Sequence, residues 1–300
     1  MLELVNIHKT FNLGTINEKK ALDGVNLQLD EGDFVTVIGG NGAGKSTFIK
    51  LLAGIFLQDK GEVRVYGVSN RSKKIHSLVK FVLESGQGLY SYLTAMENLQ
   101  YFLGLNGIAL SHIKAEVDVL CDQLAFTPYK DTLVSELSQG NRQKLTLILA
   151  LVQKPKVLCL DEPTNGLDLL AKKQLMTLLQ DYARHHQASI FITSHDASFI
   201  EKVSTRVVVI QEGRLYREGT FEEIFGNVHQ HEVYHLLLDK SAESVLKQRF
   251  PELDYKVLDG GISVETSNPD LYRLLLEETE VLQFTREPAS LEDLLYEVLK

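Results

Sequence analysis

The segment Gly39-Gly40-Asn41-Gly42-Ala43-Gly44-Lys45-Ser46-Thr47 decides the fold of this 300-residue chain. It follows an apolar run, 34–38, that is typical of a buried strand, and it precedes a run, 48–53, with one apolar helical face. A glycine-rich turn between a strand and a helix places the pattern G-x-x-x-x-G-K-[ST] in the context where backbone N–H groups wrap phosphates. The segment therefore predicts a phosphate-binding loop within an α/β domain.

Two side chains of this loop predict its ligands. Lys45 is expected to reach the terminal phosphates of ATP, and the Ser46 hydroxyl is expected to coordinate Mg²⁺. The alternative is a tight glycine turn with a solvated lysine. That alternative is disfavoured because the strand, loop and helix signals coincide in one short segment.

The composition restricts the class of protein. The length suffices for one large domain and a small appendage. The net charge of −9 argues against nucleic acid as the main partner, because binding a phosphate backbone needs clustered Lys and Arg. Cys121 and Cys159 stand in apolar runs, which favours buried reduced thiols over a disulfide or a metal site.

The sequence contains no apolar stretch long enough to cross a bilayer. The first residues also lack a basic segment followed by a hydrophobic signal core. We therefore expect a cytoplasmic protein without direct membrane insertion, for which any membrane function requires a partner.

Residues 1–225 are predicted to form one domain with three parts. Leu2–Ile7 and Gly24–Leu29 alternate as half-buried strands, which indicates an antiparallel β subdomain. Residues from about 85 to 152 show apolar side chains at helical spacing and predict a helical subdomain. Short apolar runs then return between helical segments, at 157–160, 189–193 and 206–210. Strands that alternate with helices predict a parallel sheet with right-handed crossovers.

Residues 226–300 differ in composition and predict a small α+β extension. The pattern gives a helix at 241–250, a hairpin around Gly260-Gly261, a helix from Pro269, a strand at 281–285 and a last helix from Ser290. Three histidines, His229, His231 and His235, lead into this unit. Their spacing permits metal binding, but a solvated connector is the favoured interpretation.

Two adjacent acids, Asp161 and Glu162, end the apolar run that begins at Val157. Asp161 is placed to hold Mg²⁺ through water, and Glu162 is placed to polarise the water that attacks the γ-phosphate. Two solvated acids in a turn are the alternative. That alternative is weakened by the phosphate loop, because a bound cation would offset the repulsion between the two carboxylates.

Three further motifs narrow the class of phosphate-loop protein. They are Leu137-Ser138-Gln139-Gly140-Asn141 before the acids, Pro163-Thr164-Asn165-Gly166-Leu167-Asp168 directly after them, and Ser194-His195-Asp196 at the end of the next apolar run. With the phosphate loop and the acids, this order and spacing resembles the ABC-type ATPases over about residues 1–225. The resemblance implies a P-loop NTPase core of that type.

The resemblance also implies how the site is completed. In this family two subunits form a head-to-tail dimer, so Ser138 and Gly140 of one subunit would contact the γ-phosphate held by the other. Asp168 would couple the two sites, and His195 would contact the γ-phosphate and steady the attacking water. Phe11 resembles the aromatic position that stacks on adenine, although a lone aromatic after a strand is also a common core residue.

The chain departs from the family pattern at two places. Gln139 and Asn141 stand where the family usually has a glycine and a glutamine. Glu84 stands where the family usually has a glutamine that touches Mg²⁺ and the membrane partner, with Gln87 as a less favoured alignment. Because hard cations prefer charged oxygens, Glu84 is expected to bind Mg²⁺ more strongly and to alter communication with the partner.

The chain carries one ATPase cassette, which favours the separate ATPase subunit of a membrane transporter. Its expected partners are integral-membrane permease chains, and it would form a homodimer or a heterodimer with a related ATPase at the inner face of the cell membrane. Export is favoured by the tail, 287–295, and by segment 89–99, which resemble ABC-2-type exporters. Uptake stays open because 11–47 resembles small-solute uptake systems. A soluble regulatory or assembly ATPase is a rival, and a nucleotide kinase is a more distant one.

Overall fold

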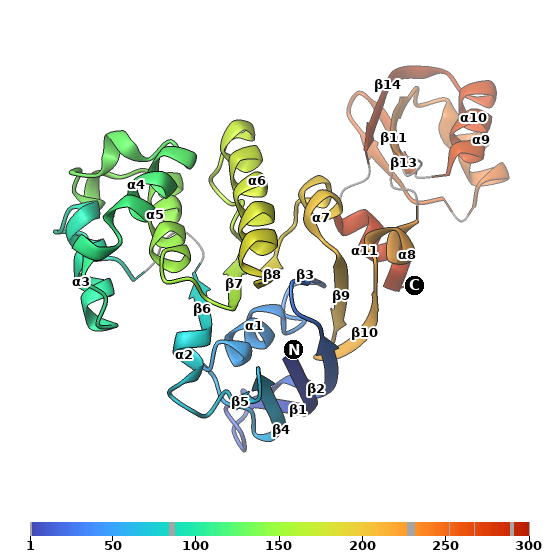
Figure 1. Cartoon of the computed structure of the whole chain (residues 1–300). Helices are drawn as coiled ribbons and strands as arrows, with labels where there is room; N and C mark the ends of the chain where they lie inside the picture. The colour runs from blue at the N-terminus through green and yellow to red at the C-terminus, as the bar shows by residue number, and fades with distance from the viewer. Residues whose placement is uncertain are drawn as a thin grey trace. The chain divides into compact units, whose positions relative to one another are not determined.

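The computed structural model describes residues 2–83, 88–226, 232–251, 253–266, 268–288 and 291–299. The chain divides into two compact units, residues 1–224 and 225–300 (Figure 1). We call them the ATPase unit and the C-terminal unit, and each is described by itself.

The ATPase unit is built on a six-stranded sheet with the order β10-β9-β3-β8-β7-β6. Its strands are β3 (Phe34–Ile38), β6 (Val79–Val82), β7 (Val157–Asp161), β8 (Ser189–Thr193), β9 (Arg206–Gln211) and β10 (Arg214–Gly219). All neighbours are parallel except β10, which pairs antiparallel with β9. Because the carboxyl ends of parallel strands meet at one edge, the residues that follow β3, β7 and β8 lie together.

A second sheet of four antiparallel strands has the order β2-β1-β4-β5. It consists of β1 (Leu2–Phe11), β2 (Lys19–Leu29), β4 (Lys60–Val65) and β5 (Val68–Ser69). Helix α1 (Lys45–Leu52) shares one hydrophobic core with this sheet and with β3. Its side chains Phe48, Ile49, Leu51 and Leu52 are fully buried, and each stabilises the fold by roughly 1.5–3 kcal/mol.

A group of helices lies beside β6 and β7 (Figure 1). It contains α3 (Ala95–Leu105), α4 (Lys114–Gln123) and α5 (Gln139–Leu151), with short 3₁₀ turns between them. Helix α3 begins at a capping box, in which Thr94 and Glu97 exchange side-chain and backbone hydrogen bonds. The remaining helices of the ATPase unit are α2 (Ile75–Leu78), α6 (Leu169–His186), α7 (Ala197–Val203) and α8 (Phe221–Phe225).

The C-terminal unit contains a four-stranded antiparallel sheet with the order β12-β13-β11-β14. Its elements are β11 (Glu232–Leu238), α9 (Ala242–Arg249), β12 (Tyr255–Leu258), β13 (Gly261–Thr266), α10 (Pro269–Glu278), β14 (Val281–Pro288) and α11 (Leu291–Leu299). The β-α-β-β-α-β order up to β14, with the first and third strands central, is a ferredoxin-like arrangement. Its core contains Leu236, Leu246, Ile262, Val264 and Leu275.

One sequence interpretation in this unit is wrong. His235 does not lie in a solvated connector, because it belongs to β11, a central strand of the sheet. Its ring lies 3.7 Å from the carboxylate of Glu265 on the neighbouring strand. His229 and His231 lie outside the described residues, and the described residues contain no cluster of three or more potential metal ligands.

The structure confirms the predicted fold class, an α/β core with a mainly parallel sheet, together with an antiparallel sheet, a helical part and an α+β C-terminal part. Strand β6 is missing from the sequence prediction because four residues form too short a run to recognise. Cys121 and Cys159 are buried free thiols, and burial raises the pKa of Cys121 to about 11. No helix in the described part of the chain is long and apolar enough to span a membrane.

Candidate active site

The glycine loop is held between two strands that approach its backbone closely. A Cβ atom on Gly39 would lie 2.1 Å from the carbonyl oxygen of Ile210, and one on Gly44 would lie 2.4 Å from that of Ala21. Gly44 also has a φ of 113° and is the N-cap of α1. Only glycine meets both conditions, so these two residues fix the loop where the N-terminus of α1 faces the cleft.

Lys45 is the first residue of α1, and its ammonium group lies over the loop. The Nζ atom donates hydrogen bonds to the carbonyl oxygens of Gly39 at 2.7 Å and Gly40 at 3.1 Å. Burial lowers the pKa of Lys45, and the nearby carboxylates of Glu162 and Asp161 oppose this shift. The site therefore holds a partly buried cation beside two acids.

Ser46 and Asp161 bring two oxygen groups together from different elements. The Ser46 hydroxyl, on α1, donates to Asp161 Oδ1 at 3.3 Å, and the Thr193 hydroxyl, at the end of β8, donates to the same oxygen at 2.8 Å. Asp161 is buried at the end of β7. A hydroxyl and a carboxylate at this spacing form a donor set that fits Mg²⁺, which prefers oxygen ligands.

Glu162 and His195 form a second pair at the same sheet edge. The Glu162 Oε1 atom lies 3.2 Å from His195 Nε2, and the two side chains are 12% and 44% exposed. Glu162 adopts a left-handed backbone conformation with a φ of 48°, and its N–H donates to the Thr193 hydroxyl at 3.0 Å. A non-glycine residue in this conformation costs on the order of 1 kcal/mol, and such strain clusters at functional sites.

These groups line a single cleft with a volume of about 320 Å³. The lining includes the predicted residues Phe11, Asn41, Gly42, Ala43, Gly44, Lys45, Ser46, Thr47, Asp161, Glu162 and His195. It also includes Lys19, Ala21 and Thr193, which the sequence motifs do not identify. Lys19 is the cross-strand partner of Phe11, so the pairing of β1 with β2 brings both to the cleft.

The Phe11 side chain has contacts on two sides. Its ring packs edge-on against Phe56 with the centroids 5.3 Å apart, and it also lines the cleft. The ammonium of Lys9 lies 5.4 Å from the Phe11 centroid. An aromatic ring at the mouth of a phosphate-binding cleft can stack on a nucleotide base.

The described chain does not bring Ser138, Gly140 or Asp168 into this cleft. Ser138 caps α5 by accepting a hydrogen bond from the Asn141 N–H at 3.2 Å, and Asp168 caps α6 by accepting one from the Ala171 N–H at 2.8 Å. A Cβ atom on Gly140 would lie 3.0 Å from the carbonyl oxygen of Gly166 in the loop after the acids. Glu84 and Gln87 lie outside the described residues.

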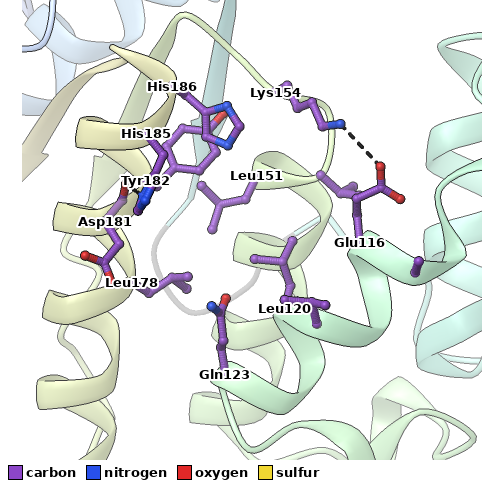
Figure 2. Close-up of a pocket in the computed structure, with 13 residues that line it drawn as sticks. Glu116, Leu120, Gln123, Leu151, Lys154, Leu178, Asp181, Tyr182, His185 and His186 are labelled. Carbon is purple, nitrogen blue, oxygen red and sulfur yellow. Dashed lines mark hydrogen bonds and ion pairs between the residues drawn. The ribbon is translucent and has the colours of Figure 1, made fainter.

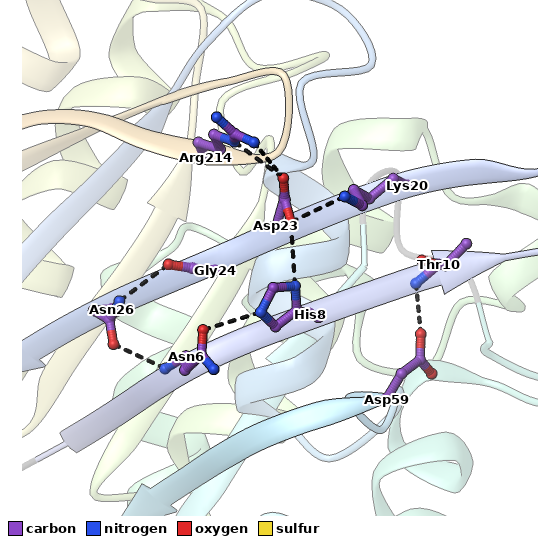
Figure 3. Close-up of polar contacts among 9 residues, drawn as sticks. All are labelled: Asn6, His8, Thr10, Lys20, Asp23, Gly24, Asn26, Asp59 and Arg214. Carbon is purple, nitrogen blue, oxygen red and sulfur yellow. Dashed lines mark hydrogen bonds and ion pairs between the residues drawn. The ribbon is translucent and has the colours of Figure 1, made fainter.

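A network of ion pairs connects Asp23 on β2 with His8 on β1, Lys20 on β2 and Arg214 on β10 (Figure 3). The Asp23 carboxylate pairs with Arg214 at 2.7 Å, with Lys20 at 3.1 Å and with His8 at 3.2 Å. Hydrogen bonds from Arg214 and then Lys20 lower the pKa of Asp23 to about 2. The Asp23 N–H also donates to Gly213 O at 2.8 Å, and the Gly213 N–H donates to the loop carbonyl of Ala43 at 3.0 Å.

A second hollow of about 400 Å³ lies between α4, α5 and α6 (Figure 2). Its lining is largely apolar and includes Leu120, Leu151 and Leu178, with a Glu116–Lys154 ion pair of 3.3 Å at its edge. The glycine loop and the strand-end acids are not part of this lining. The residues of the predicted phosphate site therefore line the smaller cleft and not this hollow, although the hollow has the larger volume.

Comparison with known proteins identifies the family. The family model described as ABC transporter matches residues 22–165. The chain is 32% identical to the bacitracin transport ATP-binding protein BcrA of Bacillus licheniformis, over 92% of this chain and 91% of that protein. It is 34% identical to the methionine import ATP-binding protein MetN of Haemophilus ducreyi, over 76% of this chain and 67% of that protein.

Solved structures agree with this result. The dimeric post-hydrolysis state of the ATP-binding cassette MJ0796, bound to ADP and Pi, has a TM-score of 0.67 and 26% identity to this chain, and the match covers 74% of this chain and 99% of that one. The family match, over residues 22–165, includes the glycine loop and the strand-end acids. The chain therefore belongs to the ATP-binding subunits of ABC transporters, and it binds and hydrolyses ATP.

Proposed function

We propose that two ATPase chains of this type close head to tail around two ATP molecules and drive an exporter through separate permease chains. The observation that supports the dimer is that the predicted ATP-contacting residues of one chain lie at two separate places. One chain supplies the loop, the acids and His195 to its cleft, while its Ser138 and Gly140 lie elsewhere, at the N-terminus of α5. A helix N-terminus with exposed N–H groups suits the γ-phosphate of a neighbouring chain.

The residues of the cleft divide the work of hydrolysis. Ser46 and Asp161 would hold Mg²⁺, which would neutralise charge on the phosphates when bound. Glu162 accepts a proton from the water whose oxygen attacks the γ-phosphorus, while the bond from that phosphorus to the ADP oxygen breaks. His195, 3.2 Å from Glu162, orients the same water and contacts the γ-phosphate. Glu84 stays a proposed further Mg²⁺ ligand.

A patch of exposed aromatic and apolar side chains supports a membrane partner. Its exposed members are Tyr92, Tyr101 and Leu105, and the half-buried Tyr90 lies beside them, all on α3 or on the segment that precedes it. Tyr92 is 70% exposed, and the Tyr90 ring packs against the rings of Tyr92 and Tyr101 with centroids 5.6 and 5.0 Å apart. Exposed apolar patches mark interaction sites. We assign this patch to short cytoplasmic helices of the permease and infer that the chain lies at the inner face of the membrane.

The direction of transport is inferred from which parts of the chain the relatives share. The match to the bacitracin transport protein extends over 92% of the chain and so includes most of the C-terminal unit. The match to the methionine import protein extends over 76%, about the share that the ATPase unit makes up. Together with the exporter-like tail, this difference favours export.

Inverted membrane vesicles that contain the native complex test this proposal. ATP added outside such vesicles reaches the ATPase directly, so an exporter fills the vesicles and an importer empties them. With labelled bacitracin as the first probe, we expect ATP-dependent accumulation that Glu162→Gln abolishes. ATP-driven release of preloaded label would support uptake instead. If the chain co-purifies only with soluble proteins, the transporter assignment is wrong and the regulatory or assembly function replaces it.

A further inference from the structure

We propose that Lys19 is a second phosphate-binding cation of the ATP site, acting from the β2 side of the cleft. This inference rests on the proposed nucleotide cleft and adds a residue that its motifs do not contain. Lys19 lies at the start of β2 and lines the cleft. Its expected ligand is the phosphate chain of a nucleoside triphosphate.

The position of the Lys19 ammonium supports this role. The Nζ atom lies 3.3 Å from the point that a Cβ atom would occupy on Gly42. Gly42 is part of the loop turn with a φ of 79°, and its missing side chain leaves the loop backbone open on that side. The ammonium therefore lies where loop N–H groups and a lysine can contact the same phosphate oxygens.

The charges of the cleft also favour a second cation. Asp161 and Glu162 add negative charge beside the phosphates, and Lys45 shares its hydrogen bonds with two loop carbonyls. A triphosphate is more negative than one lysine and one divalent cation together can neutralise. An additional ammonium group therefore lowers the electrostatic cost of binding a triphosphate next to two carboxylates.

The adjacent lysine shows that Lys19 is not simply part of a charged surface. Lys20 lies 3.1 Å from the Asp23 carboxylate, and Figure 3 shows its side chain directed toward that group. No carboxylate within the described ranges forms a comparable ion pair with Lys19. The two neighbours in sequence thus have different partners, and Lys20 provides a matched control.

Cross-strand pairing connects Lys19 to the base-binding side of the cleft. Lys19 pairs with Phe11 at the end of the β1–β2 hairpin where the connecting loop joins the two strands. If the base of a nucleotide stacks on Phe11, its phosphate chain would therefore lie next to Lys19, between the base and the glycine loop. Lys19 should then strengthen binding in proportion to phosphate charge and should not affect binding of the nucleoside alone.

Equilibrium binding to the purified full-length chain tests this inference, with ATP, ADP and adenosine as the probes in Mg²⁺ buffer. We expect Lys19→Ala to weaken ATP binding by roughly threefold to tenfold, ADP binding less, and adenosine binding not at all. Lys19→Arg should restore most of the loss, and Lys20→Ala should bind all three probes like the wild type. The dependence of ATP affinity on salt should also be shallower in Lys19→Ala.

Two results would overturn the inference. One is an unchanged ATP affinity in Lys19→Ala, and the other is an equal loss for ATP and adenosine, which would show that Lys19 only supports the shape of the cleft. Lys45→Ala in the same titration separates this test from the proposed function. If Lys45→Ala loses ATP binding while Lys19→Ala keeps it, the ATP site stands and only the role of Lys19 fails.

Discussion

The ATPase unit and the C-terminal unit both combine helices with a sheet, but their sheets arrange polar residues differently. In the ATPase unit the strands β3, β8 and β7 are parallel, so their carboxyl ends meet at one edge and deliver Lys45, His195 and Glu162 to one cleft. In the C-terminal unit every strand pair is antiparallel, so neighbouring strands end at opposite edges. Strand direction thus decides which unit can collect catalytic groups from several strand ends.

The largest expected effect is that of Glu162→Gln on the rate of ATP hydrolysis by the ATPase unit. The change keeps the shape of the side chain but removes the proton acceptor, so hydrolysis should fall by about a hundredfold to ten-thousandfold while ATP binding is retained. ATPase rates and equilibrium ATP binding measure the two properties separately. Because ATP then bridges two chains without being cleaved, size-exclusion chromatography in ATP should show a stable dimer.

Glu116→Gln is a suitable control for this change. Glu116 lies at the edge of the second hollow and pairs with Lys154, away from the cleft. It should keep the wild-type rate. Normal turnover by the Glu162→Gln protein would refute the role of Glu162 and would leave the strand-end argument without its central residue.

The second prediction asks whether catalysis depends on the ATPase unit alone. Ile262 on β13 and Ile190 on β8 are both fully buried, so replacing either with Ala creates a cavity in the core of its own unit. Each change should cost about 2–5 kcal/mol of stability in that unit. Ile262→Ala should lower the melting temperature of the C-terminal unit and keep the ATPase rate, whereas Ile190→Ala should lower the stability and activity of the ATPase unit. Calorimetry with parallel ATPase assays measures both.

A loss of ATPase activity in Ile262→Ala would contradict this separation. It would mean that the C-terminal unit supports hydrolysis, despite the concentration of the cleft residues in the ATPase unit. The same result would assign the C-terminal unit a role in ATP hydrolysis.

The two units also differ in how much the sequence predicts. The glycine loop and the strand-end acids follow from residue type and spacing, because phosphate and Mg²⁺ chemistry requires those groups near one another. The sequence alone does not predict that Lys19 lines the cleft. Its position there depends on the β1–β2 register, which shifts between Lys9 and Thr10. The sequence does not predict strand β11 either. Its histidine-containing start looks polar, and its burial depends on β13 and β14, which come later in the chain.

The smallest expected effect concerns the ion pairs around Asp23, and it depends on pH. The pKa of Asp23 is lowered from 3.8 to about 2 by Arg214 and Lys20, so the ionised carboxylate stabilises the folded state. This contribution is complete above about pH 4 and is lost as the pH falls through about 2.

Asp23→Asn should therefore melt at a lower temperature than the wild type at neutral pH, and the difference should shrink as the pH approaches 2. Thermal unfolding across this range measures it, with Asp118→Asn, which breaks an ion pair on α4, as the comparison. Arg214 follows Gly213, whose N–H donates to the loop carbonyl of Ala43, so loss of the Asp23–Arg214 ion pair in Asp23→Asn should weaken ATP binding at neutral pH, whereas Asp118→Asn should not. A melting difference that is the same at every pH would show that the effect comes from replacing a hydrogen-bond acceptor with an amide, and not from the loss of charge.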